Sequence, residues 1–231
     1  MTTLTDATIS PAMTKEEFVR HIDHSLLKPQ LTVTEIKQGC EFAKATKCAT
    51  VCIHPTSILL AKEIVAGSNT KINSVVGFPL GTHSSYIKAH EAAEAYKLGA
   101  SELDMVINIG ALKSKQYAIV KQDISGVVQA TPAIVKVILE TCYLSDEEKV
   151  TACKLVEEAG AHYVKTSTGF ASGGVTLADI RLMRQSVSPH VKVKAAGGIS
   201  TLKISLELLE AGADRLGISR TQSILDEFPA E

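Results

Sequence analysis

The feature that most constrains this chain is a repeated alternation between short β-rich runs and longer segments with apolar residues at helical spacing. The β-rich runs are Ile22–Leu26, Thr50–His54, Ile72–Val76, Glu102–Ile107, Ile134–Glu140, Tyr163–Ser167, Val191–Ala195 and Arg215–Ile218. The helical segments are Glu35–Ala45, Ser57–Ala66, Ser85–Leu98, Gln116–Gln129, Asp146–Ala159, Leu177–Gln185 and Leu202–Glu210, with a last helical stretch near Gln222–Phe228. This repeat predicts an α/β fold whose parallel strands close into a (β/α)8 TIM barrel. An open, doubly wound sheet is the alternative.

No linker rich in Pro, Gly or Ser divides the chain, so we expect a single domain over residues 14–231. Its first element is a short N-terminal helix over Thr14–Arg20, where Thr14 and Glu17 have the spacing of a capping box. The preceding residues 1–13 are mostly small or polar and lack the basic start and apolar centre of a secretory signal. They are predicted to form a disordered tail.

Charge and hydropathy exclude several classes of function. The chain has 24 Lys and Arg against 25 Asp and Glu, with both signs interspersed, which argues against a nucleic-acid surface. No apolar run approaches the roughly 20 residues that a membrane-spanning helix needs. The five cysteines are scattered without any Cys-x-x-Cys pair, a pattern typical of reduced thiols, and we therefore expect a cytoplasmic protein.

Charged residues occupy one face of several strands. Because side chains alternate between the two faces of a strand, the apolar face of each run must meet the helices and the charged face must point into the barrel. The residues predicted to meet there are Glu102, Asp104, Lys136, Glu140, Lys165 and Lys194. A buried ion-pair network that only fills the barrel is the alternative to a reactive site. Alternation alone does not choose a nucleophile among the three lysines.

Glycine-containing turns follow the last three predicted strands, at residues 169–174, 196–200 and 217–220. Glycine lets the backbone approach a ligand closely, and these loops form the usual phosphate site of a TIM barrel. Ser200 and Ser219 can add hydroxyl donors. The three turns together indicate a phosphorylated substrate.

Motifs along nearly the whole chain resemble those of the 2-deoxyribose-5-phosphate aldolases. They lie at residues 22–27 (IDHSLL), 51–55 (VCIHP), 76–81 (VGFPLG), 102–106 (ELDMV), 137–141 (VILET), 164–169 (VKTSTG) and 194–199 (KAAGGI). The resemblance implies a metal-independent class I lyase that needs no cofactor. Such an enzyme reversibly cleaves 2-deoxy-D-ribose 5-phosphate to acetaldehyde and D-glyceraldehyde 3-phosphate, a step of deoxyribose phosphate degradation.

The same resemblance assigns the catalytic residues. It implies that Lys165 forms the Schiff base and that Lys194 and Asp104 are its catalytic partners. Burial and the charge of Lys194 favour the neutral amine that a nucleophile needs. The expected substrate-binding residues are Asp23, Ser25, Thr168, Gly169, Gly197, Gly198, Gly217 and Ser219. The expected partner is a phosphorylated sugar, with no nucleic acid or membrane, in a homodimer or homotetramer.

Four further residues bear on this assignment. Cys52 aligns with a cysteine near the family's pocket but is expected to pack as an apolar residue, and Lys136 and Glu140 are expected to surround the catalytic residues. Phe170 stands where some family members have a lysine, so phosphate binding is expected to depend on backbone amides and hydroxyls. The chain ends in Phe-Pro-Ala-Glu, whereas some members end in a tyrosine thought to assist proton exchange.

Three other functions are compatible with parts of the pattern. A metal-dependent enzyme would use His21, Asp23, His24, His54 or His83, although their spacing matches no common metal motif. A sugar-phosphate isomerase would explain the glycine turns without requiring two interior lysines. A non-catalytic sensor of phosphorylated ligands would keep the turns and release no acetaldehyde.

Overall fold

A closed barrel of parallel strands, ordered β1 to β8 as in the sequence, forms the centre of the computed structural model, which describes residues 13–229. The strands are β1 (Ile22–Leu26), β2 (Thr50–Ile53), β3 (Lys71–Val76), β4 (Glu102–Val106), β5 (Ile134–Ile138), β6 (Tyr163–Lys165), β7 (Lys192–Ala196) and β8 (Arg215–Ile218). Closure is direct, because β8 pairs with β1 through Asp23 and Gly217. The predicted TIM barrel is therefore confirmed, and the open sheet is wrong.

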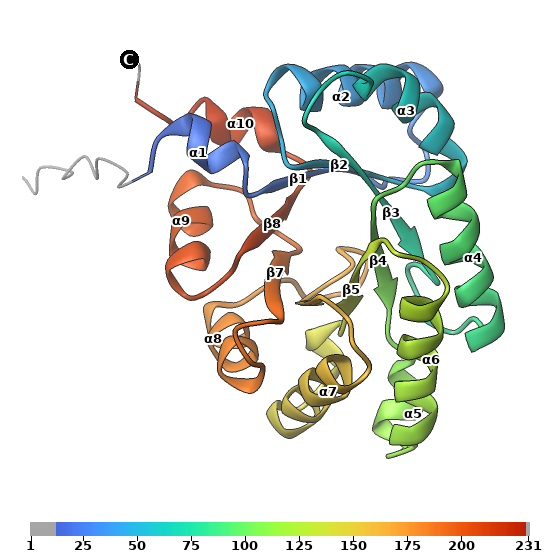
Figure 1. Ribbon diagram of the computed structural model, residues 1–231. Coiled ribbons are helices and arrows are strands. Elements are labelled where there is room, and N and C mark those ends of the chain that lie inside the picture. The colour runs from blue at the N-terminus through green and yellow to red at the C-terminus, as the bar shows by residue number, and fades with distance from the viewer. Residues whose placement is uncertain (1–12, 230–231) are drawn as a thin grey trace, which may run out of the picture.

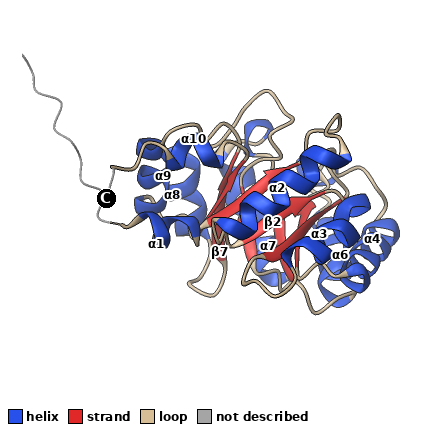
Figure 2. Cartoon of the chain, turned by 90° about the horizontal axis from the view of Figure 1, so that it is seen from above, coloured by secondary structure: helices blue, strands red, loops and turns tan. Residues whose placement is uncertain are grey.

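Helices surround the barrel on its outer side (Figures 1 and 2). They are α1 (Lys15–Val19), α2 (Val33–Ala45), α3 (Ile58–Val65), α4 (Ser85–Leu98), α5 (Ile109–Lys113), α6 (Tyr117–Gln129), α7 (Asp146–Glu158), α8 (Leu177–Ser186), α9 (Leu202–Glu210) and α10 (Thr221–Leu225). Two 3-10 turns, η1 (Pro55–Ser57) and η2 (Thr141–Tyr143), follow β2 and β5. None of the helices in residues 13–229 combines the length and apolar character needed to cross a membrane.

Local sequence signals explain where the helices begin. Thr14 and Glu17 form the predicted capping box of α1, and Thr32 with Glu35 forms an equivalent box on α2. In each box the hydroxyl accepts a backbone N–H, and the glutamate accepts one in return, which satisfies donors that a helix start leaves free. The predicted tail over residues 1–13 lies outside the described residues except for Met13.

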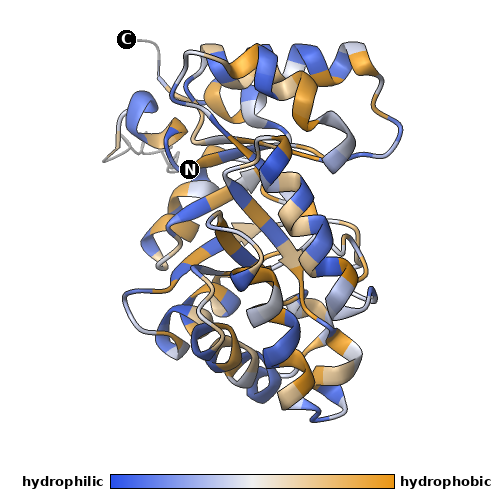
Figure 3. Cartoon of the chain, turned by 45° about the vertical axis from the view of Figure 1, so that its right-hand side comes forward, coloured by the Kyte–Doolittle hydropathy of each residue, from blue (hydrophilic) through white to orange (hydrophobic). Residues whose placement is uncertain are grey.

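The hydrophobic core lies between the barrel and its helices. Outward-facing strand residues such as Leu103, Met105, Val135 and Val137 are fully buried in it. The helices carry both hydrophobic and hydrophilic positions, as Figure 3 shows, and bury their apolar positions against the strands. Phe18 of α1 packs against Phe228, which follows α10, with ring centroids 5.3 Å apart.

Candidate active site

Asp104 on β4 is the centre of a buried group of charges inside the barrel. Its Oδ2 accepts hydrogen bonds from the side-chain nitrogens of Lys165 at 2.7 Å and Lys194 at 2.8 Å. Its Oδ1 accepts from Lys136 at 3.0 Å and from the side-chain amide of Asn73 at 3.0 Å. Strand alternation therefore placed Asp104 and the three lysines correctly.

A second layer of charges lies nearer the start of the strands. Asp23 on β1 accepts hydrogen bonds from Arg215 at 2.6 Å, from Thr50 at 2.7 Å and from Lys194. Glu102 lies 2.7 Å from the Lys136 ammonium and 3.4 Å from the Arg215 guanidinium. Asp23 has no exposed surface, so the structure places this expected substrate ligand within the charge network.

The strand register explains why these groups meet. Lys165 and Lys194 are directly paired positions on β6 and β7, and Asp104 is paired with Lys136 across β4 and β5. Paired positions on neighbouring strands point to the same side of the sheet. The two lysines that approach Oδ2 of Asp104 thus come from adjacent strands at the same height in the barrel.

The three lysines differ in their proton affinity. Burial, reinforced by the charge of Lys194, lowers the pKa of Lys165 below its ordinary value, although Asp104 opposes this shift. Burial also acts against the charged form of Lys194, but Asp104 and Asp23 outweigh it and raise its pKa. For Lys136, burial is likewise outweighed, by Asp104, Asp23 and Glu102, and the pKa is raised. The neutral amine is therefore favoured at Lys165 alone among the three.

Counting charges leads to the same lysine. The ion-paired network within residues 13–229 contains the carboxylates of Asp23, Glu102 and Asp104. Its cations are Lys136, Lys165, Lys194 and Arg215. Burying an uncompensated charge is costly, so loss of one proton brings three carboxylates and three cations into balance. Lys165 is the member that burial and neighbouring charges select for that loss.

Lys165 is also the interior lysine that lies closest to solvent. Its side chain is 3% exposed, whereas those of Lys136 and Lys194 are 0% exposed. Phe78, in the loop after β3, and Phe170, in the turn after β6, meet edge to face with ring centroids 5.3 Å apart. A small apolar cluster of Leu27, Cys52 and Val75 packs against Phe78. Burial raises the pKa of the Cys52 thiol to about 11, as expected for a packed cysteine.

The turns after β6 and β7 are pressed against each other. Gly197 and Gly198 have φ of 97° and 81°, in the region that favours glycine. A Cβ at Gly174 would lie only 2.4 Å from the carbonyl oxygen of Gly197, so a larger residue cannot fit there without moving backbone. Val175 donates its backbone N–H to that same oxygen at 3.0 Å. Gly169 also has a positive φ, of 84°, and no atom within 4 Å of the position where a Cβ would lie.

Glu140 differs from its prediction. It was expected to lie in a strand that points into the charge network, but β5 ends at Ile138 and Glu140 adopts a left-handed backbone, with φ of 54°. This turn directs its carboxylate to Thr168, whose backbone N–H donates at 3.2 Å and whose hydroxyl also donates. Burial raises the pKa of Glu140, and these hydrogen bonds oppose that shift. Glu140 thus holds the turn after β6.

Sequence reasoning missed two polar residues of the interior, Asn73 and Arg215, and it placed Ser167 on the strand face of Lys165 without giving it a role. Asn73 holds Asp104, and Arg215 completes the network at the start of β8. The hydroxyl of Ser167 is buried without a hydrogen-bond partner in residues 13–229. Asn73 and Arg215 lie on the inward faces of β3 and β8, so the alternation rule applied to those two strands could have found both.

The histidines of the metal alternative are not brought together. His21, His24 and His54 each bond a different group, namely the Asp214 carbonyl, the Thr221 hydroxyl and the Leu27 carbonyl. Over residues 13–229, no group of three or more His, Cys, Asp or Glu side chains is placed to hold a metal ion.

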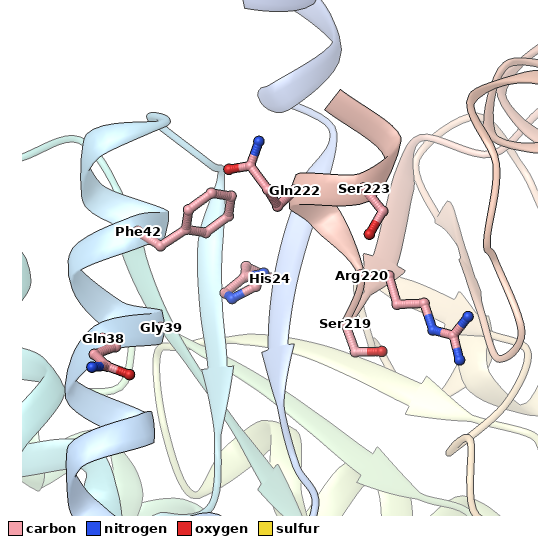
Figure 4. Close-up of a pocket in the computed structure, with 8 residues that line it drawn as sticks. All are labelled: His24, Gln38, Gly39, Phe42, Ser219, Arg220, Gln222 and Ser223. Carbon is pink, nitrogen blue, oxygen red and sulfur yellow. The ribbon is translucent and has the colours of Figure 1, made fainter. Parts of the chain in front are cut away.

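His24 faces away from the barrel interior, into a pocket of about 410 Å³ beside α2 and α10. Its ring lies 5.0 Å from that of Phe42, and burial lowers its pKa to about 4. Figure 4 shows Ser219 and Arg220 on the other side of this pocket, with their side chains directed toward the ends of the strands and away from Phe42. Arg220 is exposed and has no hydrogen bond or ion pair within residues 13–229.

Comparison with known proteins agrees with this arrangement. Residues 11–221 match the family model described as DeoC/LacD family aldolase. The deoxyribose-phosphate aldolase of Enterococcus faecalis is 51% identical over 217 residues, covering 93% of this chain and 99% of that protein. That of Thermococcus kodakarensis is 50% identical over 224 residues, covering 95% of this chain and all of the relative.

A solved structure extends the likeness to three dimensions. The deoxyribose phosphate aldolase from Aeropyrum pernix, described as having a unique tetrameric structure, superposes with a TM-score of 0.86 at 30% identity. The match covers 93% of this chain and 92% of that one. Sequence family, relatives and fold all agree, and the chain belongs to the DeoC/LacD family of aldolases.

Proposed function

We propose that this protein is a deoxyribose-phosphate aldolase, which reversibly cleaves 2-deoxy-D-ribose 5-phosphate to acetaldehyde and D-glyceraldehyde 3-phosphate. The observation that carries the proposal is the interior charge network. Among its three lysines, Lys165 alone has a lowered pKa and a side chain with some exposed surface. An unprotonated amine in a buried site is the requirement for attack on an aldehyde. The relatives at about half identity bear the same activity in their names.

The chemistry follows from this placement. The Lys165 amine adds to C1 of the open-chain sugar, and the carbinolamine loses water to give an iminium. A base then removes the proton of the C3 hydroxyl, the C2–C3 bond breaks, and its electron pair moves into the iminium to give an enamine and glyceraldehyde 3-phosphate. Protonation of the enamine at C2 and hydrolysis release acetaldehyde and restore the amine.

Asp104 and Lys194 are the proposed proton-transfer pair. They are hydrogen-bonded to each other at 2.8 Å, and Asp104 is bonded to the Lys165 nitrogen at 2.7 Å. A proton can pass along such a chain when the carbinolamine loses its hydroxyl and when the enamine is protonated. Lys136 and Asp23 act through these residues, since they fix the charge and position of Asp104 and Lys194.

The phosphate is proposed to bind at the turns after the last three strands. Thr168, Gly169, Gly197, Gly198 and Ser219 offer backbone N–H groups and hydroxyls there, and the turns approach each other closely. Gly217 keeps space beside Lys194, because a Cβ there would lie 3.3 Å from its Cε. Arg220 is the sole charged residue in the three turns, and its guanidinium has no partner among residues 13–229, so we assign it as the cation that binds phosphate. Ser25 completes the list as a ligand for a substrate hydroxyl.

We further propose a homo-oligomer located in the cytoplasm. The Aeropyrum pernix relative is described as tetrameric. Several large apolar side chains are exposed on α4 and its preceding loop, among them Leu80, Tyr86 and Ile87. The cysteines are all free, which suits a reducing compartment.

The test is a coupled assay for glyceraldehyde 3-phosphate released from 2-deoxyribose 5-phosphate, with borohydride trapping of the acetaldehyde adduct followed by peptide mapping. Wild type should turn over and carry an ethyl group on Lys165. Lys165→Met should lose both signals, whereas Lys192→Met, an exposed lysine at the start of β7, should keep both. Trapping on another lysine, or no turnover by wild type, would refute the assignment.

A further inference from the structure

Ser167 carries a hydroxyl that is fully buried yet bonded to nothing within residues 13–229. The other two buried oxygens in this situation belong to Asn73 and Asp123, whose remaining polar side-chain atoms are hydrogen-bonded. Ser167 makes no side-chain hydrogen bond at all. Leaving a buried polar group unpaired costs free energy, so such a group in a site calls for an explanation.

The backbone directs Ser167 into the barrel. Although β6 ends at Lys165, its pairing continues, because Thr166 donates its N–H to the Lys194 carbonyl at 3.1 Å. On the other side, the Thr166 carbonyl accepts the N–H of Thr141 at 3.1 Å. Extended backbone that is paired on both sides keeps alternating, so Ser167 shares its face with Lys165.

Ser167 lies between the Schiff-base lysine and the phosphate turns. Its Cβ is 3.0 Å, and its hydroxyl oxygen 3.4 Å, from the position that a Cβ at Gly197 would take. Gly197 belongs to the turn after β7 that is proposed to bind phosphate. If C1 of the sugar phosphate is joined to Lys165 and its phosphate group binds at these turns, the carbons between C1 and the phosphate must lie beside Ser167.

The cleavage reaction indicates which substrate hydroxyl can hydrogen-bond Ser167. The oxygen on C3 must reach the proton-transfer pair of Asp104 and Lys194, since its proton leaves when the C2–C3 bond breaks. C4 is the next carbon toward the phosphate. Resting on the function proposed above, we propose that the Ser167 hydroxyl hydrogen-bonds the C4 hydroxyl of the substrate and is a specificity-determining residue of this aldolase.

A serine suits that task because its hydroxyl can both donate and accept, as can the sugar hydroxyl. In the direction of bond formation, the C4 hydroxyl is the one next to the aldehyde carbon of glyceraldehyde 3-phosphate. An acceptor that lacks this hydroxyl leaves Ser167 buried and unpaired in the complex. A site built to hydrogen-bond a substrate hydroxyl discriminates against such an analogue.

The experiment measures this preference with acetaldehyde as donor. The two acceptors are D-glyceraldehyde 3-phosphate and 3-oxopropyl phosphate, which keeps the aldehyde and the phosphate but lacks the hydroxyl. Wild type should favour the first acceptor, and Ser167→Ala should reduce the ratio of the two kcat/KM values by about tenfold, the effect of one lost hydrogen bond. Borohydride trapping of acetaldehyde on Lys165 should be unchanged.

Ser74→Ala is the matched control. Ser74 is equally buried but donates its hydroxyl to the Ile53 carbonyl at 3.3 Å, on the face of β3 away from the barrel interior. This variant should melt lower and keep the wild-type ratio, while Ser167→Ala should melt no lower than wild type. Ser167→Cys, which keeps the size and weakens the hydrogen bond, supplies the ratio if the alanine variant does not fold.

An unchanged ratio in Ser167→Ala would overturn the inference alone. If both kcat/KM values fall by the same factor, the hydroxyl acts at C3 or Ser167 has a structural role; if neither value falls, Ser167 has no contact with the substrate. A wild type that forms neither adduct nor product would instead overturn the proposed function, and this inference with it.

Discussion

Lys136 and Lys165 both hydrogen-bond Asp104, yet replacing Lys136 should destabilise the fold strongly and replacing Lys165 should change its stability little. Lys136 is a charged member of the network and is bonded to Glu102 at 2.7 Å and to Asp104 at 3.0 Å. Lys165 is the member whose pKa is lowered, so it gives up its proton most readily of the three lysines. Replacing each by methionine keeps the length of the side chain and removes the nitrogen, so the pair of variants separates a charged lysine from a neutral one.

The magnitude follows from the charge count. Lys136→Met leaves three carboxylates against two fixed cations, Lys194 and Arg215, and a buried pair broken on one side costs about 3–5 kcal/mol. In a chain of this size, that lowers the melting temperature by roughly 6–20 °C. Lys165→Met leaves three carboxylates and three cations, so its stability should stay within about 1 kcal/mol of wild type.

Thermal and urea melts followed by circular dichroism give both free energies, with the exposed Lys192→Met as a control. Lys136→Met should also move the acid limb of the pH–activity profile to higher pH, because the unbalanced carboxylates favour a protonated Lys165. An equal loss of stability in Lys136→Met and Lys165→Met would refute the reasoning, since it would make Lys165 a charged member of the network.

Three further predictions concern pH and the phosphate turns. Because the folded state lowers the pKa of Lys165 below its ordinary 10.5, the unfolded state binds more protons between the two values, and the free energy of unfolding should rise with pH across that window. kcat/KM should rise with pH as the folded-state pKa is approached from below and level off above it. Lys165→Met should abolish this part of the stability slope. Arg220→Ala should raise KM for 2-deoxyribose 5-phosphate about tenfold, equivalent to about 1.4 kcal/mol, without changing KM for unphosphorylated 2-deoxyribose, while the exposed Arg181→Ala changes neither. Glu140→Gln should weaken the hold on Thr168 and raise KM more than it lowers kcat; an unchanged KM for the phosphorylated substrate would contradict this role.

Much of the fold could be predicted because the signals are local. The bounds of β1, β8, α4 and α9 agree with the predicted ones, and the others end within a few residues of them. The short helix α5 was missed, because five residues give too little helical periodicity to recognise. Its start depends on Asn108, whose side chain accepts the backbone N–H of Ala111, a cap that sits where a strand was expected to end.

The site could be predicted only as far as strand alternation holds. Alternation placed Asp104, Lys165 and Lys194 in one interior, and these positions lie within regular, paired strands. It failed at Glu140, where the backbone leaves the strand and turns left-handed. It also says nothing about distance along the barrel axis, so Asp23 was expected at the substrate, whereas it lies among the charges near the start of the strands.

These two differences change the charge balance of the interior. The predicted interior held three lysines and three carboxylates, a balanced set in which every lysine could remain charged. In the structure Glu140 leaves the set, Asp23 enters it, and Arg215 adds a fourth cation. Lys165 has a single carboxylate partner within hydrogen-bond distance, Asp104, which it shares with Lys194 and Lys136, and burial lowers its pKa. Arg215 pairs with Asp23 and Glu102 rather than with Asp104, and it adds a positive charge to the network. The reactivity of Lys165 is therefore a property of the whole network, which Arg215→Met should reveal by raising the pH at which activity appears.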